Sequence, residues 1–175
     1  MMISLSNQHI SISCFLIFML ILPKIKAQDN ASRIIKWGEL EKILSDSTDS
    51  TTVINFWASW CKPCLREIPV FEKIRKEKSG TAIQFIYVSL DFAKEKTEKL
   101  DPFVKNNLQG AKVLLLDEPN YNKWLRKVEP DWNGAIPMTL VLNNSRKKRL
   151  FASSEITEKK LRSMIDSISF HTNTH

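Results

Sequence analysis

Two cysteines lie two residues apart in the stretch WCKPC, where Cys61 and Cys64 enclose a lysine and a proline. Pairs with this spacing serve as metal ligands, as structural crosslinks or in reversible thiol–disulfide exchange. A zinc site needs about four ligands, but the chain adds only three histidines, all close to its two ends. A structural disulfide across two residues closes too small a loop to stabilise a fold much. The pair therefore favours redox chemistry, with no metal and no bound cofactor.

The position of the pair explains how it would react. Residues 52–59, TVINFWAS, are apolar, β-branched and aromatic, which is typical of a buried strand. Behind the cysteines, apolar residues recur every three positions, as in an amphipathic helix: Leu65, Ile68, Phe71 and Ile74. Cys61 is then expected at the start of this helix, where free backbone N–H groups and the helix dipole stabilise a thiolate. Pro63 suits the first helical turn because it has no N–H to lose.

The same placement predicts the order in which the two sulfurs react. We expect Cys61 to lie nearer the solvent and to attack a partner disulfide as a thiolate, which forms a mixed disulfide. Cys64, held more deeply, then attacks the sulfur of Cys61 and releases the reduced partner. The same steps run backwards make the protein an oxidant.

The rest of the chain alternates strands with helices, and its 175 residues suit one domain. Apolar runs predict further strands at 82–91 and 111–117, and a hairpin at 138–144 and 147–153. Helices are predicted after a short strand within 34–45, and at 64–78, 95–110, 118–128 and 155–169. Pro102 is expected to start or kink its helix, and Ser154 or Thr157 to cap the last one. This order predicts an α/β sandwich of three layers, in which helices cover both faces of a central mixed sheet with an antiparallel edge.

The first 27 residues do not resemble part of a domain. Residues 10–22 form an apolar run of 13 residues, which suits a signal peptide better than a membrane-spanning helix, and Ala27 is a small residue before a cleavage point. The alternative is an uncleaved N-terminal anchor that tethers the protein to a membrane, since no Lys or Arg precedes the run. We expect a domain at 28–175, with its core at about 33–169, in the periplasm or otherwise outside the cytoplasm.

The net charge of the chain indicates which classes of partner to expect. The chain carries a formal charge of +7, and removal of residues 1–27 leaves 24 basic and 19 acidic side chains, a charge of +5. Such a charge helps to steer acidic partners. The basic run RKKR at 146–149 lacks aromatic neighbours on which bases stack, so we predict a solvated turn and no nucleic acid. We expect a monomer that acts on protein thiols and disulfides.

Two motifs carry a resemblance to a known family. The stretch VINFWASWCKPC, together with GAIPMTLVL at 134–142, resembles the thioredoxin superfamily and its exported thiol–disulfide oxidoreductases of the ResA and TlpA type. The resemblance covers about residues 33–169 and implies a thioredoxin-like fold. It implies a cis peptide bond before Pro137, with Ile136 and Pro137 opposite the cysteines, where they hold the partner's backbone. Trp60 is expected to shield the disulfide and to contact partners.

The same resemblance draws attention to two polar residues. Asn55 stands where thioredoxin has a buried aspartate, and an asparagine cannot take a proton. Glu67 matches a glutamate of the ResA-like proteins and lies one helical turn beyond Cys64, so it is a candidate to shuttle the proton of Cys64. The alternative is a surface carboxylate near a helix start. Among the other tryptophans, Trp132 either borders the site or packs in the core, and packing roles are expected for Trp37, Trp57 and Trp124.

The family resemblance favours an exported reductase of protein disulfides. It would receive electrons from a membrane donor and act in cytochrome c assembly or in the repair of mispaired cysteines. Three alternatives stay open: a disulfide oxidase or isomerase with the same chemistry, a thiol peroxidase, and a non-catalytic binding module with this fold. A peroxidase normally carries a lone activated cysteine in a turn rich in Pro and Thr, rather than a pair after a tryptophan.

Overall fold

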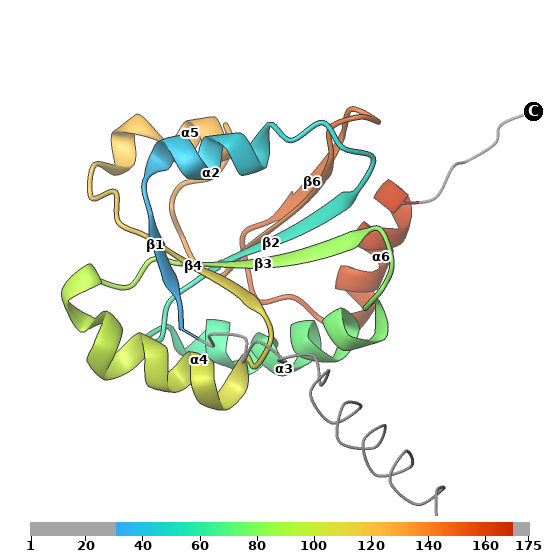
Figure 1. The fold of residues 1–175 in the computed structure, drawn as a ribbon. Helices are drawn as coiled ribbons and strands as arrows, with labels where there is room; N and C mark the ends of the chain where they lie inside the picture. Colours follow the sequence, from blue (N-terminus) through green and yellow to red (C-terminus); the bar gives the residue numbers. More distant parts are fainter. Residues whose placement is uncertain (1–30, 170–175) are drawn as a thin grey trace, which may run out of the picture.

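The computed structural model describes residues 31–169 (Figure 1), and the predicted signal segment at 1–27 lies outside this range. No helix within the described range is long and apolar enough to cross a membrane. The described residues form the α/β sandwich that the sequence predicts.

Six strands in this part of the chain form a single sheet, in the order β1-β4-β3-β2-β5-β6. The first four in this order run parallel to one another, whereas β5 is antiparallel to both β2 and β6, so the predicted mixed sheet with an antiparallel edge is confirmed. The strands are β1 Arg33–Ile35, β2 Thr51–Trp57, β3 Ile83–Ser89, β4 Lys112–Leu116, β5 Met138–Asn143 and β6 Lys148–Ala152.

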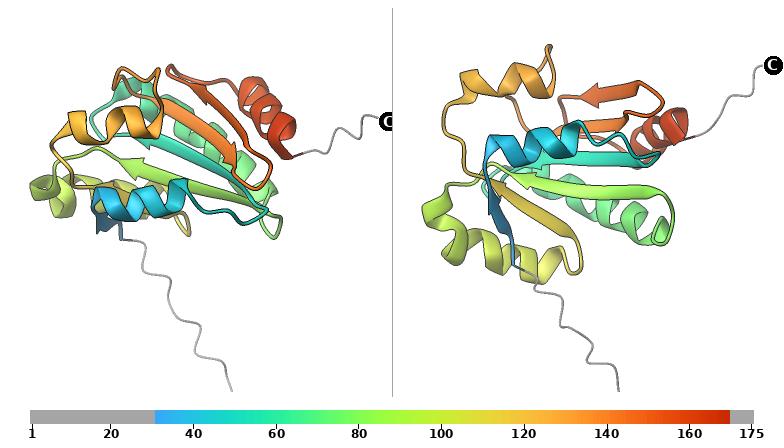
Figure 2. Two further views of the ribbon diagram at one scale, coloured as in Figure 1. Left: turned by 90° about the horizontal axis from the view of Figure 1, so that it is seen from above. Right: turned by 45° about the horizontal axis from the view of Figure 1, so that its top comes forward.

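Helices cover both faces of this sheet, as Figures 1 and 2 show. One face carries α3, α4 and α6, and the other carries α2 and α5. The longer helices are α2 Trp37–Leu44, α3 Lys62–Glu77, α4 Asp101–Asn107 and α6 Glu158–Ser169. The short ones are α5 Leu125–Val128, η1 Ala93–Glu95, η3 Tyr121–Lys123 and the π-helical turn η2 Lys96–Leu100.

Local sequence signals set the ends of two helices. Pro102 lies in the first turn of α4, directly after the π-helical turn, so it starts this helix as predicted. The N–H of Lys160 donates to Oγ1 of Thr157 at 3.3 Å, and Thr157 immediately precedes α6. Of the two predicted caps for the last helix, Thr157 is therefore the one used.

The strand that leads to the cysteines is the most enclosed element. Every residue of β2 is buried, because β3 and β5 flank it and helices cover both of its faces. Val53 and Trp57 pack into the cluster under α3, while Ile54 and Phe56 pack into the cluster under α2. This explains why the strand reads as a continuous apolar run rather than an alternating one. It also gives the cysteine loop a rigid starting point.

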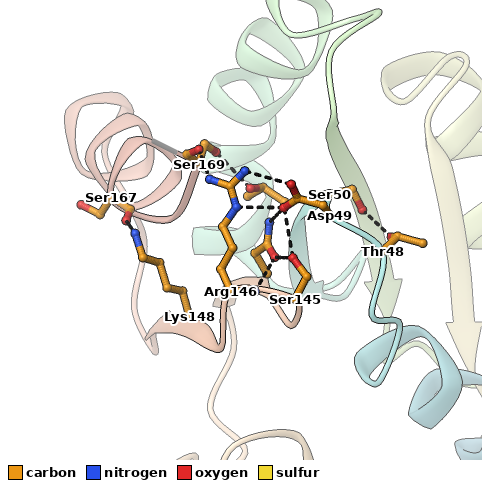
Figure 3. Close-up of polar contacts among 10 residues, drawn as sticks. Thr48, Asp49, Ser50, Ser145, Arg146, Lys148, Ser167 and Ser169 are labelled. Atoms are coloured by element: carbon orange, nitrogen blue, oxygen red, sulfur yellow. Dashed lines mark hydrogen bonds and ion pairs between the residues drawn. The ribbon is translucent and has the colours of Figure 1, made fainter. Parts of the chain in front are cut away.

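The basic turn between β5 and β6 makes contacts that the sequence did not predict. The guanidinium of Arg146 donates to the two carboxylate oxygens of Asp49 at 2.8 and 3.2 Å, and to the backbone carbonyl of Ser169 at 2.6 Å (Figure 3). Lys148 donates to the carbonyl of Ser167 at 3.1 Å. The run therefore fastens the loop before β2 and the end of α6 to the hairpin. The predicted turn is present at residues 144–147, with Lys147 and Arg149 exposed, but its contacts were not predicted because the partners are distant in the sequence.

Replacement of Arg146 by glutamine tests whether its contacts with Asp49 and Ser169 stabilise the fold. The Arg146 guanidinium beside Asp49 holds the pKa of that carboxyl well below its usual range. A lowered pKa in the folded state adds stability above the ordinary pKa of 3.8, and this stability is lost as the pH falls towards the folded-state pKa. In urea unfolding at pH 7, we expect R146Q to have a lower midpoint than the wild type, with the difference shrinking in strong acid.

The matched control is Lys105→Gln on the exposed face of α4, which should leave the unfolding midpoint unchanged. An R146Q protein as stable at pH 7 as this control would contradict a structural role for the basic run.

Candidate active site

The two cysteines form a disulfide at the start of α3. Their Cα atoms lie 5.2 Å apart and their sulfurs are bonded. Cys61 is the N-cap residue of α3, and the backbone N–H of Cys64 donates to its sulfur at 3.3 Å. Cys61 keeps a 5% exposed surface, whereas Cys64 has none. A partner's sulfur can therefore reach Cys61 from outside and cannot reach Cys64.

The helix begins at this point for local reasons. The chain leaves β2 and turns sharply, with the N–H of Cys61 donating to the carbonyl of Ala58 at 3.0 Å. Pro63 then fills the first helical turn, where its missing N–H costs nothing. The N-terminal end of a helix carries about half a positive charge, which stabilises a thiolate at the capping position. The sulfur of Cys61 is the atom placed to gain from it.

A buried aspartate holds the loop in front of the cysteines. Asp91 is 4% exposed and accepts hydrogen bonds from the N–H and the hydroxyl of Ser59, at 3.0 and 2.6 Å. The hydroxyl of Ser89 donates to the same carboxylate at 2.7 Å. This anchor was missed in the sequence, although a carboxylate that directly ends the apolar run YVSLD is a signal for one.

The second motif faces the cysteines, as the resemblance implies. The peptide bond between Ile136 and Pro137 is cis, and the carbonyl oxygen of Ile136 lies 3.8 Å from the sulfur of Cys61. Behind this loop, the indole N–H of Trp132 donates to the carbonyl of Ala135 at 2.8 Å. Trp132 is 2% exposed, so of its two predicted roles it has the packing one, from which it supports the loop.

Glu67 is a buried carboxylate, so the alternative of a surface carboxylate is excluded. It is 1% exposed, and its two oxygens accept hydrogen bonds from Nδ2 of Asn55 at 2.8 Å and from the N–H of Ile156 at 2.9 Å. Burial raises the pKa of Glu67 to about 7, although both of these hydrogen bonds pull it down. Sequence spacing indicated the helix face but gave no sign of the contacts with Asn55 and Ile156.

The five tryptophans divide sharply by exposure. Trp60, directly before Cys61, is 57% exposed, whereas Trp57 and Trp124 are fully buried and Trp37 packs partly buried against the core under α2. Packing roles are therefore confirmed for these last three.

Within residues 31–169, no group of three or more His, Cys, Asp or Glu side chains is placed to hold a metal ion.

Comparison with known proteins agrees with this geometry. The sequence model of the AhpC/TSA family matches residues 22–148. "Thioredoxin-like protein YneN" of Bacillus subtilis is 28% identical over 125 residues, which cover 70% of this chain and 68% of YneN. "Sporulation thiol-disulfide oxidoreductase A" of the same organism is 27% identical over 82 residues, 47% of this chain and only 50% of that protein.

Among solved structures, a thioredoxin-related protein from Neisseria meningitidis serogroup B superposes with a TM-score of 0.59 at 22% identity. The superposition covers 69% of this chain and 85% of that one, which confirms the thioredoxin-like fold. Because the family match spans well over half of the residues, the chain belongs to the AhpC/TSA family of thioredoxin-like proteins.

Proposed function

We propose that this thioredoxin-like thiol–disulfide oxidoreductase is exported and works as a reductase of protein disulfides. The observation that carries the proposal is the pair of sulfurs at the start of α3, of which one is reachable and capped by a helix N–H while the other is buried. A structural crosslink needs neither this difference in access nor a buried carboxylate one turn away.

In the first step, the thiolate of Cys61 in the reduced protein attacks one sulfur of the partner's disulfide. A bond forms between the two sulfurs, the partner's own S–S bond breaks, and its other sulfur leaves as a thiolate that takes a proton from water. The carbonyl of Ile136, 3.8 Å from the sulfur of Cys61, supports a role of Ile136 and Pro137 in holding the partner's backbone. Trp60 extends this surface beside the sulfur.

In the second step, the thiol of Cys64 loses its proton to the carboxylate of Glu67. The resulting thiolate attacks the sulfur of Cys61 and displaces the partner's second sulfur. Two electrons have then passed to the partner, and the enzyme is left with the Cys61–Cys64 disulfide that the structure contains. A base whose pKa is about 7 both accepts and returns a proton easily near neutral pH.

The direction and location of the reaction rest on the sequence. The resemblance to ResA-like proteins favours a membrane donor of electrons that reduces the Cys61–Cys64 disulfide again, and cytochrome c assembly as one setting. We take residues 1–27 as the export signal, with an uncleaved anchor as the alternative, and 28–175 as the exported domain, a monomer outside the cytoplasm. Such a compartment is oxidising, so a reductase there needs a dedicated donor.

The reduction potential of the Cys61–Cys64 couple separates a reductase from an oxidase. A reductase is expected at about −270 mV or lower, and an oxidase nearer −120 mV. Equilibration with mixtures of reduced and oxidised dithiothreitol or glutathione, followed by alkylation, measures it. We expect the low value, and a value near −120 mV would contradict the reductase.

A variant with both cysteines replaced by serine is the control for catalysis itself. It should lose all disulfide reduction, whereas a non-catalytic binding module would keep its activity.

A peroxide-consumption assay on the wild type separates the reductase from a thiol peroxidase, which would turn over peroxide rapidly.

The proton role of Glu67 predicts a slow second step in Glu67→Gln. Loss of general base catalysis should slow release of the reduced partner by about a hundredfold at pH 7. Formation of the mixed disulfide, followed alone in a Cys64→Ser background, should not change. Single-turnover kinetics with a fluorescent disulfide peptide measures both steps. An equal slowing of the two steps would assign Glu67 a structural role instead.

The raised pKa of Glu67 should also change how the free energy of unfolding depends on pH. A carboxyl whose pKa rises from 4.5 to about 7 on folding binds more protons in the folded state than in the unfolded state across this interval. The free energy of unfolding of the oxidised protein, in which the bonded cysteines do not titrate, should therefore fall as the pH rises from 4.5 to 7. This slope should flatten in Glu67→Gln and persist in Glu77→Gln, an exposed control on the same helix. An unchanged slope in Glu67→Gln would refute the raised pKa.

A further inference from the structure

Two large aromatic side chains are exposed on the loops that follow β2 and β3. Trp60 is 57% exposed and Phe92 is 60% exposed. Exposed aromatic rings are costly in water, and aromatic side chains are enriched where proteins bind one another. The proposed mechanism uses Trp60, but it gives Phe92 no part.

Hydrogen bonds tie the two loops together one residue before each ring. Ser59, which precedes Trp60, donates twice to the carboxylate of Asp91, which precedes Phe92. β2 and β3 are parallel neighbours, so both loops leave the same end of the sheet. The buried Asp91 therefore holds the loop of Phe92 beside the loop of the reactive cysteine.

Each ring has an exposed lysine two residues after it in the chain, Lys62 after Trp60 and Lys94 after Phe92. The Nζ atom of Lys94 lies 5.8 Å from the centroid of the Phe92 ring. Lys62, between the two cysteines, is also exposed, and neither lysine has a carboxylate partner in the part of the chain that the structure describes. Among the carboxylates of the same segment, Asp91 is buried against Ser59 and Glu95 pairs with Lys99 at 2.8 Å, whereas Glu98 is exposed.

We propose that Phe92 and Lys94 form, together with Trp60, a docking surface for the disulfide-bearing partner. Its occupant is an extended polypeptide segment in which an apolar side chain and an acidic side chain flank the cysteine. The apolar side chain packs on the two rings, and the acidic one faces Lys94. This inference rests on the proposed function, since the partner is the substrate of the reductase, and it names the class of sequence that the enzyme prefers.

Peptides with one internal disulfide test the proposal when they are matched in length and flanked by acidic, neutral or basic residues. The reference substrate is bis(2-hydroxyethyl) disulfide, which is small and uncharged and cannot span the surface. For Phe92→Ala, we expect kcat/KM for the peptides, relative to the small disulfide, to fall about tenfold, as for a truncated interface aromatic. For Lys94→Glu, the preference for acidic peptides should reverse towards basic ones.

Two variants serve as matched controls: Leu150→Ala, an exposed apolar side chain on the edge strand β6, and Lys105→Glu on α4. Both should keep the wild-type ratio and the wild-type charge preference.

The possible results distinguish a failure of the docking surface from a failure of the proposed reductase function. A wild-type protein that reduces neither the peptides nor the small disulfide defeats the proposed function itself. If the wild type reduces both, but Phe92→Ala and Lys94→Glu behave like the controls, the docking surface is wrong and the function stands. An equal loss with both substrates in Phe92→Ala also overturns the docking role, because the ring then acts on the cysteines rather than on the partner.

Discussion

The chemistry of this protein depends on the contact between one sulfur and the positive end of one helix. Cys61 caps α3, and the N–H of Cys64 points at its sulfur from 3.3 Å. A helix end stabilises a negative charge most at this position, and a thiolate there both forms easily and leaves easily. The enclosed strand β2 fixes where the helix starts, because every one of its residues is buried. The rigid core therefore fixes the position of the helix start, and the helix start sets the reactivity of the sulfur of Cys61.

Around this contact, each functional loop is fastened by a buried polar group. Asp91 holds the loop before the cysteines, and Trp132 holds the loop before the cis-proline through the carbonyl of Ala135. Asn55 and the N–H of Ile156 hold the two oxygens of Glu67. Hydrogen bonds between buried groups are strengthened by the low local dielectric, so they help to keep the sulfurs, the base and the partner-binding loop in fixed positions relative to one another. Disulfide exchange needs this alignment because three sulfurs must come into line.

Sequence reasoning reached the parts of the structure that local patterns encode. Continuous apolar runs, apolar positions three residues apart and the cysteine spacing predicted the order of strands and helices, the position of Cys61 at a helix start and the mixed sheet. It failed where a side chain finds its partner far along the chain. The spacing of Glu67 from Cys64 indicated a shared helix face, but not that Ile156, 89 residues away, closes over the carboxylate. Arg146 lies in the predicted turn, but its ion pair with Asp49 was not predicted because the two residues are 97 positions apart.

The most direct test of the central claim is the pKa of the Cys61 thiol in the reduced protein. The rate of alkylation by iodoacetamide, measured against pH with the modified cysteine identified by mass spectrometry, reports this value. An ordinary cysteine titrates at about 8.5, and the helix end should bring Cys61 into the range of about 3.5 to 7.5. Alkylation of Cys61 that rises only at pH of about 8.5 or above would show that the helix end does not activate this sulfur.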